Sequence, residues 1–144
     1  MIPTEPLPTK HRLLAACRGD THDDDHPLLT AARDLAALHE SRLSAGLAQA
    51  ESIDQCRARL VRDIDRWVTA QLRPSLGAAR VHTETVGSVV DRLAEYTALA
   101  YAALASSSNW VLGDAWERLA ELAVGYEDLK DEVGTGHRRL PGGP

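Results

Sequence analysis

Apolar residues recur at three- and four-residue steps in four separate segments of this 144-residue chain. A period of this kind places the apolar side chains along one side of an α-helix. The first segment predicts a long helix over residues 28–50, with Pro27 in a position that suits its first turn. Its stripe consists of Leu28, Ala32, Leu35, His39, Leu43 and Leu47.

A second helix is predicted to follow, with Ser52 as its N-cap and Gln55 in the capping-box position. It ends near Arg73, because Pro74 disfavours a helical conformation of the residue before it. Its stripe consists of Ile53, Cys56, Leu60, Ile64, Trp67 and Val68. The break between these two helices is weakly marked, so one kinked rod is the alternative.

The third helix is predicted to open at Thr83–Thr85, after a loop over residues 74–82, and to end before Ser106–Asn109. The fourth begins near Trp110 or Asp114 and stops at Gly134. A short apolar piece, Leu13–Cys17, predicts one or two helical turns near the N-terminus.

The predicted fold class is therefore all-α, an antiparallel helical bundle of about four long helices with a short N-terminal helix. Residues that favour strands are sparse, which argues against a sheet. The chain divides into a flexible N-terminal segment over residues 1–26, the bundle over residues 27–136 and a disordered tail over residues 137–144.

Composition narrows the classes of function. A net charge of −5 argues against binding to nucleic acid. Charges interrupt every apolar stretch, and the proline-containing start does not resemble a signal peptide, so no membrane association is expected. Cys17 and Cys56 are expected to be reduced thiols of a cytoplasmic protein. No cofactor motif and no complete set of catalytic residues is recognisable, so enzymatic activity stays undecided.

Two polar residues fall inside the predicted apolar stripes, His39 on the first helix and Arg57 on the second. An inward arginine needs a carboxylate or a polar pocket, because an unpaired buried charge is unfavourable. The candidate partners are Glu40, Glu51 and Glu127. His39 and Arg57 form either a satisfied core pair or the polar part of a small-molecule pocket between helices.

Other charged groups are expected to be exposed. The run from His22 to His26 is interpreted as a solvated linker and not as a metal site. One side of the third helix is predicted to be an acidic face of Glu84, Ser88, Asp91 and Glu95. An outer basic stripe on the second helix could pair with that face, within the bundle or across a dimer, and consists of Arg59, Arg62, Arg66 and Arg73.

The spacing of Arg33 and His39 fits the loose Arg-x(4–6)-His pattern of helical-bundle ribonucleases of the higher-eukaryote and prokaryote nucleotide-binding type. Chance matches to so loose a pattern are common. It also lies early in this chain and late in those proteins, so a ribonuclease has the least support.

Several stretches resemble a bacterial family of unknown function, DUF4254, in its actinobacterial form. The resemblance would cover roughly residues 27–141. It rests on Leu38-His39-Glu40, Ile64-Asp65-Arg66-Trp67-Val68, His82-Thr83-Glu84-Thr85, Gly87 to Leu93, Leu119 to Leu122, Tyr126 to Leu129 and Gly136 to Pro141.

The resemblance implies a helical bundle without an established activity, and it draws attention to the turn into the third helix. There, Thr83 or Thr85 can cap exposed amides, and Gly87 permits close approach of a neighbouring backbone. The alternative is a small anion or polar-ligand site in the same turn. That site would use His82, Thr83, Glu84, Asp91 and Arg92.

The function that these patterns favour is a non-enzymatic bundle protein that associates with itself as a homodimer. Trp67, Trp110 and Trp116 are the large apolar side chains that such an interface would use. The alternative is a small-molecule-binding protein, or an accessory enzyme of bacterial secondary or envelope metabolism, with an interhelical polar pocket.

Overall fold

The computed structural model of the chain describes residues 6–20, 25–106 and 109–142. Within these residues the chain forms five helices and two short strands. In chain order they are α1 Lys10–Cys17, α2 Pro27–Arg42, α3 Leu47–Gln71, β1 Arg80–Val81, α4 Val86–Ser106, α5 Asn109–Gly134 and β2 Arg138–Arg139. The predicted all-α bundle of four long helices with a short N-terminal helix is confirmed.

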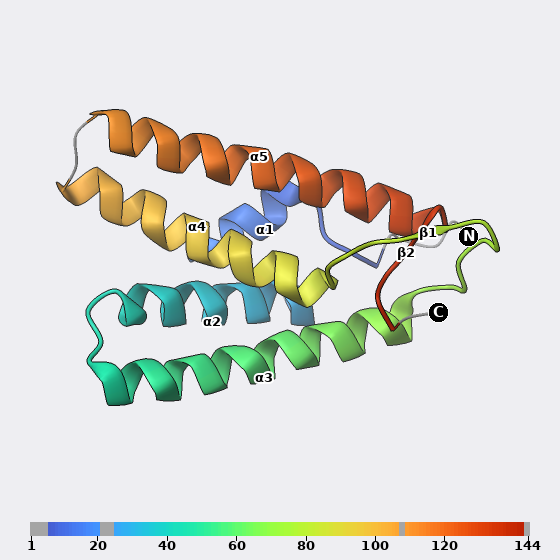
Figure 1. Ribbon diagram of the computed structural model, residues 1–144, viewed down its shortest axis with the longest axis horizontal. Coiled ribbons are helices and arrows are strands. Elements are labelled where there is room, and N and C mark those ends of the chain that lie inside the picture. The colour runs from blue at the N-terminus through green and yellow to red at the C-terminus, as the bar shows by residue number, and fades with distance from the viewer. Residues whose placement is uncertain (1–5, 21–24, 107–108, 143–144) are drawn as a thin grey trace.

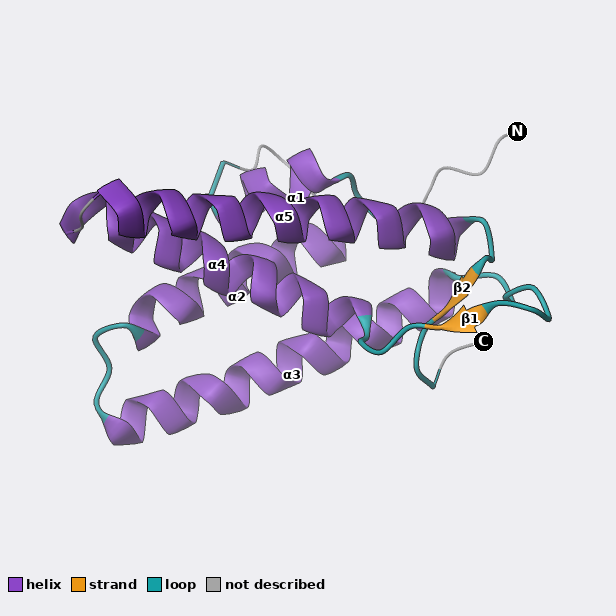
Figure 2. Ribbon diagram, turned by 45° about the horizontal axis from the view of Figure 1, so that its top comes forward, coloured by secondary structure: helices purple, strands orange, loops and turns teal. Residues whose placement is uncertain are grey.

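The central helix of the bundle is α4, which packs against α1, α2, α3 and α5 (Figure 1). α3 packs against α2 and α4 and forms the outer edge opposite α5. The α2–α3 turn, the end of α4 and the start of α5 lie at one end of the bundle, and both strands lie at the other (Figures 1 and 2).

Leucine and valine side chains dominate the core. The largest fully buried side chains are Tyr126, Leu13, Leu28, Leu29, Leu35, Leu93, Val68, Val86 and Val90. α3 contributes only Ile64 and Val68 to the buried set. Most of its surface is therefore in solvent, which fits its place at the edge.

The predicted boundary between the first two helices is wrong. α2 ends at Arg42, and Leu43, Ser44 and Ala45 donate their backbone N–H groups to carbonyls three residues earlier. Gly46 then takes an extended conformation as the N-cap of α3. The chain thus reverses direction over residues 43–46, so the helix predicted over residues 28–50 and the alternative of one kinked rod are both excluded.

That turn also changes the interpretation of two apolar residues. Leu43 and Leu47 continue the period of the first stripe, but they are 52% and 93% exposed. Ser52, the predicted N-cap, lies inside α3.

The N-terminal segment packs on the bundle. The side chains of Leu7 and Leu13 are buried, and the Tyr126 hydroxyl of α5 donates to the carbonyl of Pro8 at 2.6 Å. His26 accepts a hydrogen bond from the Leu28 amide and so caps α2.

The C-terminal segment differs from the predicted disordered tail over residues 137–142, while residues 143–144 lie outside the described part. β2 pairs in parallel with β1, and the His82 amide donates to the Arg139 carbonyl at 2.7 Å. Leu140 is buried against the core. Two-residue strands give almost no periodic signal, which explains why the sequence did not predict them.

None of the helices in the described residues combines the length and the apolar character needed to cross a membrane.

α3 and α4 approach each other closely at Gly87. The Gly87 amide donates to Asp65 Oδ1 at 2.7 Å, and a Cβ atom there would lie 2.6 Å from both that oxygen and the Val61 carbonyl oxygen. The prediction that Gly87 permits close backbone approach is confirmed.

We expect Gly87→Ala to destabilise the fold by about 1–3 kcal/mol, because the backbone of α3 must move to relieve the overlap. The matched control is Gly125→Ala in α5, where nothing lies within 4 Å of the added Cβ. That change should stabilise the protein by up to about 1 kcal/mol through helix propensity. Urea unfolding of both variants measures the difference, and equal stabilities would contradict the close approach.

Candidate functional site

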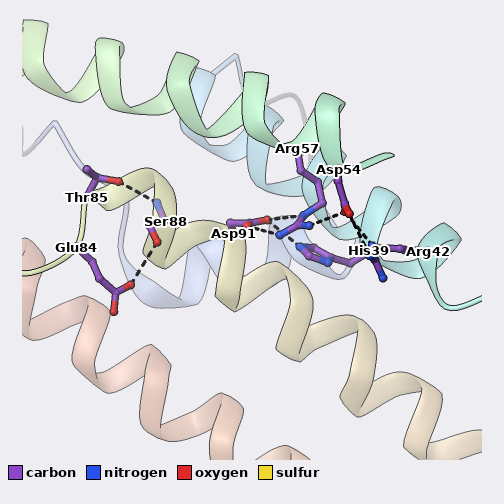
Figure 3. A network of polar contacts seen from close by, with 8 residues as sticks. All are labelled: His39, Arg42, Asp54, Arg57, Glu84, Thr85, Ser88 and Asp91. Carbon is purple, nitrogen blue, oxygen red and sulfur yellow. Dashed lines mark hydrogen bonds and ion pairs between the residues drawn. The ribbon is translucent and has the colours of Figure 1, made fainter. Parts of the chain in front are cut away.

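A row of alternating charges joins α2, α3 and α4 (Figure 3). Asp91 of α4 stands at its centre. Its Oδ1 lies 2.8 Å from His39 Nε2 of α2. Arg57 of α3 donates to the same carboxylate twice, from Nε at 3.2 Å and from Nη2 at 2.7 Å.

The row continues from Arg57 toward the surface. Arg57 Nη1 donates to Asp54 Oδ1 at 2.8 Å. Arg42 of α2 donates to both carboxylate oxygens of Asp54, from Nε at 2.8 Å and from Nη2 at 3.0 Å. Paired hydrogen bonds of this kind fix direction as well as distance. The network of His39, Arg42, Asp54, Arg57 and Asp91 therefore sets how the three helices sit against one another.

Helical spacing brings these groups together. His39 and Arg42 are three residues apart on α2, as are Asp54 and Arg57 on α3, so each pair shares one helix face. On α4, small residues stand four before, three after and seven after Asp91, namely Gly87, Ala94 and Ala98. This small-residue stripe leaves room for side chains of α2 and α3 to reach the carboxylate.

His39 and Arg57 were correctly predicted to point inward, but their predicted partners were wrong. Asp91 takes that place, and not Glu40, Glu51 or Glu127. Glu40 and Glu51 are exposed, and Glu127 accepts from the Lys10 amide at the other end of the bundle.

Burial and pairing act in opposite directions on Asp91. Its side chain is 15% exposed and that of His39 is 5% exposed. Burial would raise the pKa of Asp91, but the hydrogen bonds from His39 and Arg57 and the charge of Arg57 outweigh it and lower that pKa. Asp91 is therefore ionised at neutral pH, and since a carboxylate only accepts hydrogen bonds, His39 Nε2 carries the proton.

The outer half of the network is closer to solvent. Hydrogen bonds from Arg42 and Arg57 lower the pKa of Asp54 to about 2. The hydrogen bond and charge of Asp54 raise the pKa of Arg42, and the hydrogen bond of Asp91 raises that of Arg57. Arg42 and Arg57 balance the charges of Asp54 and Asp91, so these four groups hold no surplus charge with which to attract an ionic substrate.

A second polar cluster lies at the turn into α4. Thr85 Oγ1 accepts from the Ser88 amide at 3.1 Å, which is the capping role predicted for Thr83 or Thr85. Glu84 accepts from Ser88 Oγ at 3.4 Å (Figure 3). It also accepts from Arg92 Nη2 at 2.6 and 2.8 Å. The Gly87 and Ser88 amides of the first turn are thus occupied by Asp65 and Thr85, which leaves this turn poorly suited to an anion.

The residues predicted for that turn do not all converge. His82 pairs through its backbone with Arg139, and Thr83 is exposed. Arg92 contacts Glu84, while its Nε is buried without a hydrogen-bond partner among the described residues. Asp91 belongs to the network one turn further along α4.

The predicted acidic face of α4 is wrong. None of Glu84, Ser88, Asp91 and Glu95 is fully exposed, and Asp91 faces α2 and α3. The reason is that α4 is central and contacts neighbours on several sides.

The structure assembles no site from the other two patterns found in the sequence, the Arg-x5-His pair and the run from His22 to His26. Arg33 is exposed and lies near Asp34, whereas His39 is buried on Asp91, so the Arg-x5-His pair forms no common site. Of the run from His22 to His26, residues 22–24 lie outside the described part, and His26 caps α2. The described residues include no group of three metal-ligating side chains.

The hollow beside the network is small. It has a volume of about 70 Å³ and is lined by His39, Arg42, Leu43, Glu95, Ala98 and Leu99. Pockets that hold a drug-sized molecule usually measure about 300–1,000 Å³. The network therefore serves to hold the three helices together.

Comparison with known proteins gives one match. The model of a family described as "Protein of unknown function (DUF4254)" matches residues 31–109, from α2 to the first residue of α5. This is shorter than the predicted extent of 27–141, and the resemblance in α5 and the tail lies outside it. Neither the curated proteins nor the solved structures include a match to this chain.

We expect Asp91→Asn to destabilise the protein by about 2–3 kcal/mol. The amide cannot neutralise Arg57, and removal of one partner from a buried pair leaves an uncompensated charge. The value lies below that for a fully buried pair because Arg57 keeps Asp54. Asp63→Asn on the exposed side of α3 is the control, and urea unfolding should show almost no change for it.

The lowered pKa values of Asp54 and Asp91 predict acid sensitivity. In the unfolded chain both carboxyls titrate near their ordinary value of 3.8, so their contribution to stability is complete above that pH. It is lost as the pH falls toward 2, where Asp54 becomes protonated in the folded state. Thermal unfolding between pH 6 and 2, compared with Asp91→Asn, checks this, because the variant should lose less stability on acidification.

Proposed function

The chain belongs to the DUF4254 family, and we propose that it is a non-enzymatic bundle protein that acts through association with a second copy of itself. The observation that carries the proposal is the uneven distribution of exposed apolar side chains. Ten large hydrophobic residues are exposed among those described. Seven of them lie on the half of the bundle near the α2–α3 and α4–α5 turns (Figure 1). This apolar end consists of Leu43, Leu47, Leu99, Tyr101, Leu104, Trp110 and Val111.

Trp110 is the most informative member of the apolar end. It is 78% exposed at the first turn of α5. The other two tryptophans have partners within the molecule, since Trp67 lies against His26 and Trp116 against Tyr101. Exposed tryptophans are enriched among the residues that dominate binding energy at interfaces.

A groove beside the apolar end supplies the complementary shape. It lies between α1, α2 and α4, has a volume of about 780 Å³ and shares Leu43 and Tyr101 with the apolar end. Its lining is mainly small and includes Ala36, Ala37, Ala98, Ala102 and Ala105. Protruding side chains and a hollow on one surface are what a two-fold symmetric contact requires, because each copy must supply both halves.

The energetic requirement also favours this surface. Full burial of one large apolar side chain contributes about 1.5–3 kcal/mol. Association loses on the order of 4–15 kcal/mol in freedom of motion. The seven side chains are between 43% and 93% exposed, so their burial together contributes an amount of the same order as that loss. The three exposed apolar residues elsewhere would contribute less than half as much.

The small-molecule alternative has less support. His39 and Arg57 already satisfy each other through Asp91, and the adjoining hollow of about 70 Å³ has no room for a metabolite. An enzyme would also need a reactive group that its neighbours do not already occupy.

The proposal includes a bacterial origin and a cytoplasmic location. The family resemblance supports the proposed bacterial origin. Cys17 and Cys56 are both free thiols, which supports a reducing compartment. Burial raises the pKa of Cys17 to about 12, so this thiol is an unreactive part of the core.

We expect the wild-type chain to elute as a dimer in size-exclusion chromatography with light scattering. The double variant Leu104→Glu, Trp110→Glu should elute as a monomer, because two charges at the apolar end would have to be desolvated on association. A dissociation constant at least about tenfold higher corresponds to a loss of only about 1.4 kcal/mol.

The control is Val81→Glu, which places a charge on β1 at the opposite end of the bundle. Val81 is 49% exposed, close to the 55% of Leu104. This variant should remain dimeric. A wild-type chain that stays monomeric at high micromolar concentration would exclude this function, and a dimer unaffected by the double variant would place the contact elsewhere.

A further inference from the structure

α3 exposes an arginine stripe that the bundle does not neutralise. Arg59, Arg62 and Arg66 lie on one side of the helix, and Arg73 follows its C-terminal end. All four are exposed, and their side chains make no ion pair with any described residue. Like charges three and four residues apart destabilise a helix slightly. The exposed carboxylate of Asp63, between Arg62 and Arg66, relieves part of this repulsion, but three arginines against one carboxylate leave this side of α3 positive.

Most other arginines of the structure lie beside a carboxylate. Arg18, Arg33, Arg42, Arg57, Arg92, Arg118 and Arg138 all lie within ion-pair distance of a carboxylate. The lack of partners is therefore concentrated on α3 and on the nearby residues Arg80 and Arg139.

An acidic stripe of matching geometry lies on α5. Glu117, Glu121 and Asp128 are exposed and have no ion-pair partner in the described part of the chain. Their separations are four and seven residues, so they share one side of the helix. Arg62 and Arg66 repeat the four-residue separation on α3. Arg73 follows the extended residue Leu72 and therefore leaves the helical register.

The two stripes cannot meet within one molecule. α4 lies between α3 and α5, which form opposite edges of the bundle (Figure 1). Both helices begin at the end that holds the α2–α3 and α4–α5 turns, so they run in the same direction (Figure 1). A second copy in the same orientation can therefore bring its α5 alongside the α3 of the first with the two helices parallel.

We propose that the arginine stripe on α3 docks on the acidic stripe of α5 of another copy. Parallel alignment places Arg62 opposite Glu117 and Arg66 opposite Glu121. The contact joins two different surfaces, so each added molecule presents a new stripe at its far edge. Association through this contact continues beyond two copies.

The contact is weak and depends on salt. An exposed ion pair changes an equilibrium constant by a factor of about 1.4–5, so two pairs give a factor of about 2–25. Salt screens such pairs, whereas it does not weaken apolar association. This contact does not require the apolar end, and the opposite effects of salt separate the two.

The test is sedimentation velocity of the full chain at about 0.01 M and about 1 M ionic strength, where the Debye length is about 30 Å and 3 Å. The wild-type chain should form species beyond the dimer only at the lower ionic strength. Reversal of the α3 charges in Arg62→Glu, Arg66→Glu should remove them, with a dissociation constant at least tenfold higher. Reversal of the α5 charges in Glu117→Arg, Glu121→Arg should do the same.

A mixture of the two reversed proteins provides the decisive measurement. The acidic α3 of one protein then faces the basic α5 of the other, so large species should reappear in the mixture although neither protein forms them alone. The matched control is Arg80→Glu, Arg139→Glu, which changes the net charge equally but lies off the stripe and should associate as the wild type does. Circular dichroism confirms that each variant is folded.

Three results would overturn the proposal. The first is identical sedimentation of the wild type at both ionic strengths. The second is a mixture that does not recover the large species. The third is a control that weakens association as much as the stripe variants do. Loss of the dimer at high salt would instead contradict the apolar contact of the proposed function.

Discussion

The carboxylate of Asp91 lies between three helices, and its charge must be neutralised there. Burial of an ionised group is unfavourable unless partners surround it. His39 and Arg57 reach Asp91 from α2 and α3, and Arg57 is held in turn by Asp54 and Arg42. Apolar contacts alone tolerate small shifts between helices. Paired hydrogen bonds do not, so this network fixes the position of α2 and α3 against α4.

The position of the network also explains why one end of the bundle is apolar outside. His39 reaches Asp91, and Arg42, which reaches Asp54, is the last residue of α2. α4 continues to Ser106. Leu43 and Leu99 line the same small hollow, so they mark where α2 stops covering α4. The last turns of α4 and the first turn of α5 consequently present leucine, tyrosine and tryptophan to solvent.

The sequence predicted what depends on local rules. Thr85 and Gly87 were recognised at the start of α4, and the inward direction of His39 and Arg57 followed from helical period. The partner Asp91 was missed because a contact across 52 residues has no sequence rule. The small residues Gly87, Ala94 and Ala98 around Asp91 were the available signal. The turn at residues 43–46 was missed because Leu43 and Leu47 keep the helical period of the buried residues before them. Both side chains are nevertheless exposed, and in the proposed dimer a second copy would cover them.

The charged side chains on the two faces of α3 have different roles. Asp54, Arg57 and Asp65 point toward α2 and α4, where each has a specific partner that sets helix position. Arg59, Arg62 and Arg66 point away and have none among the described residues. A helix that needed charge only for solubility would balance both signs on its outer face, since alternating charges at helical spacing also stabilise it. Asp63 is one carboxylate against three arginines there. The positive surplus is understandable if the compensating carboxylates belong to a neighbouring molecule.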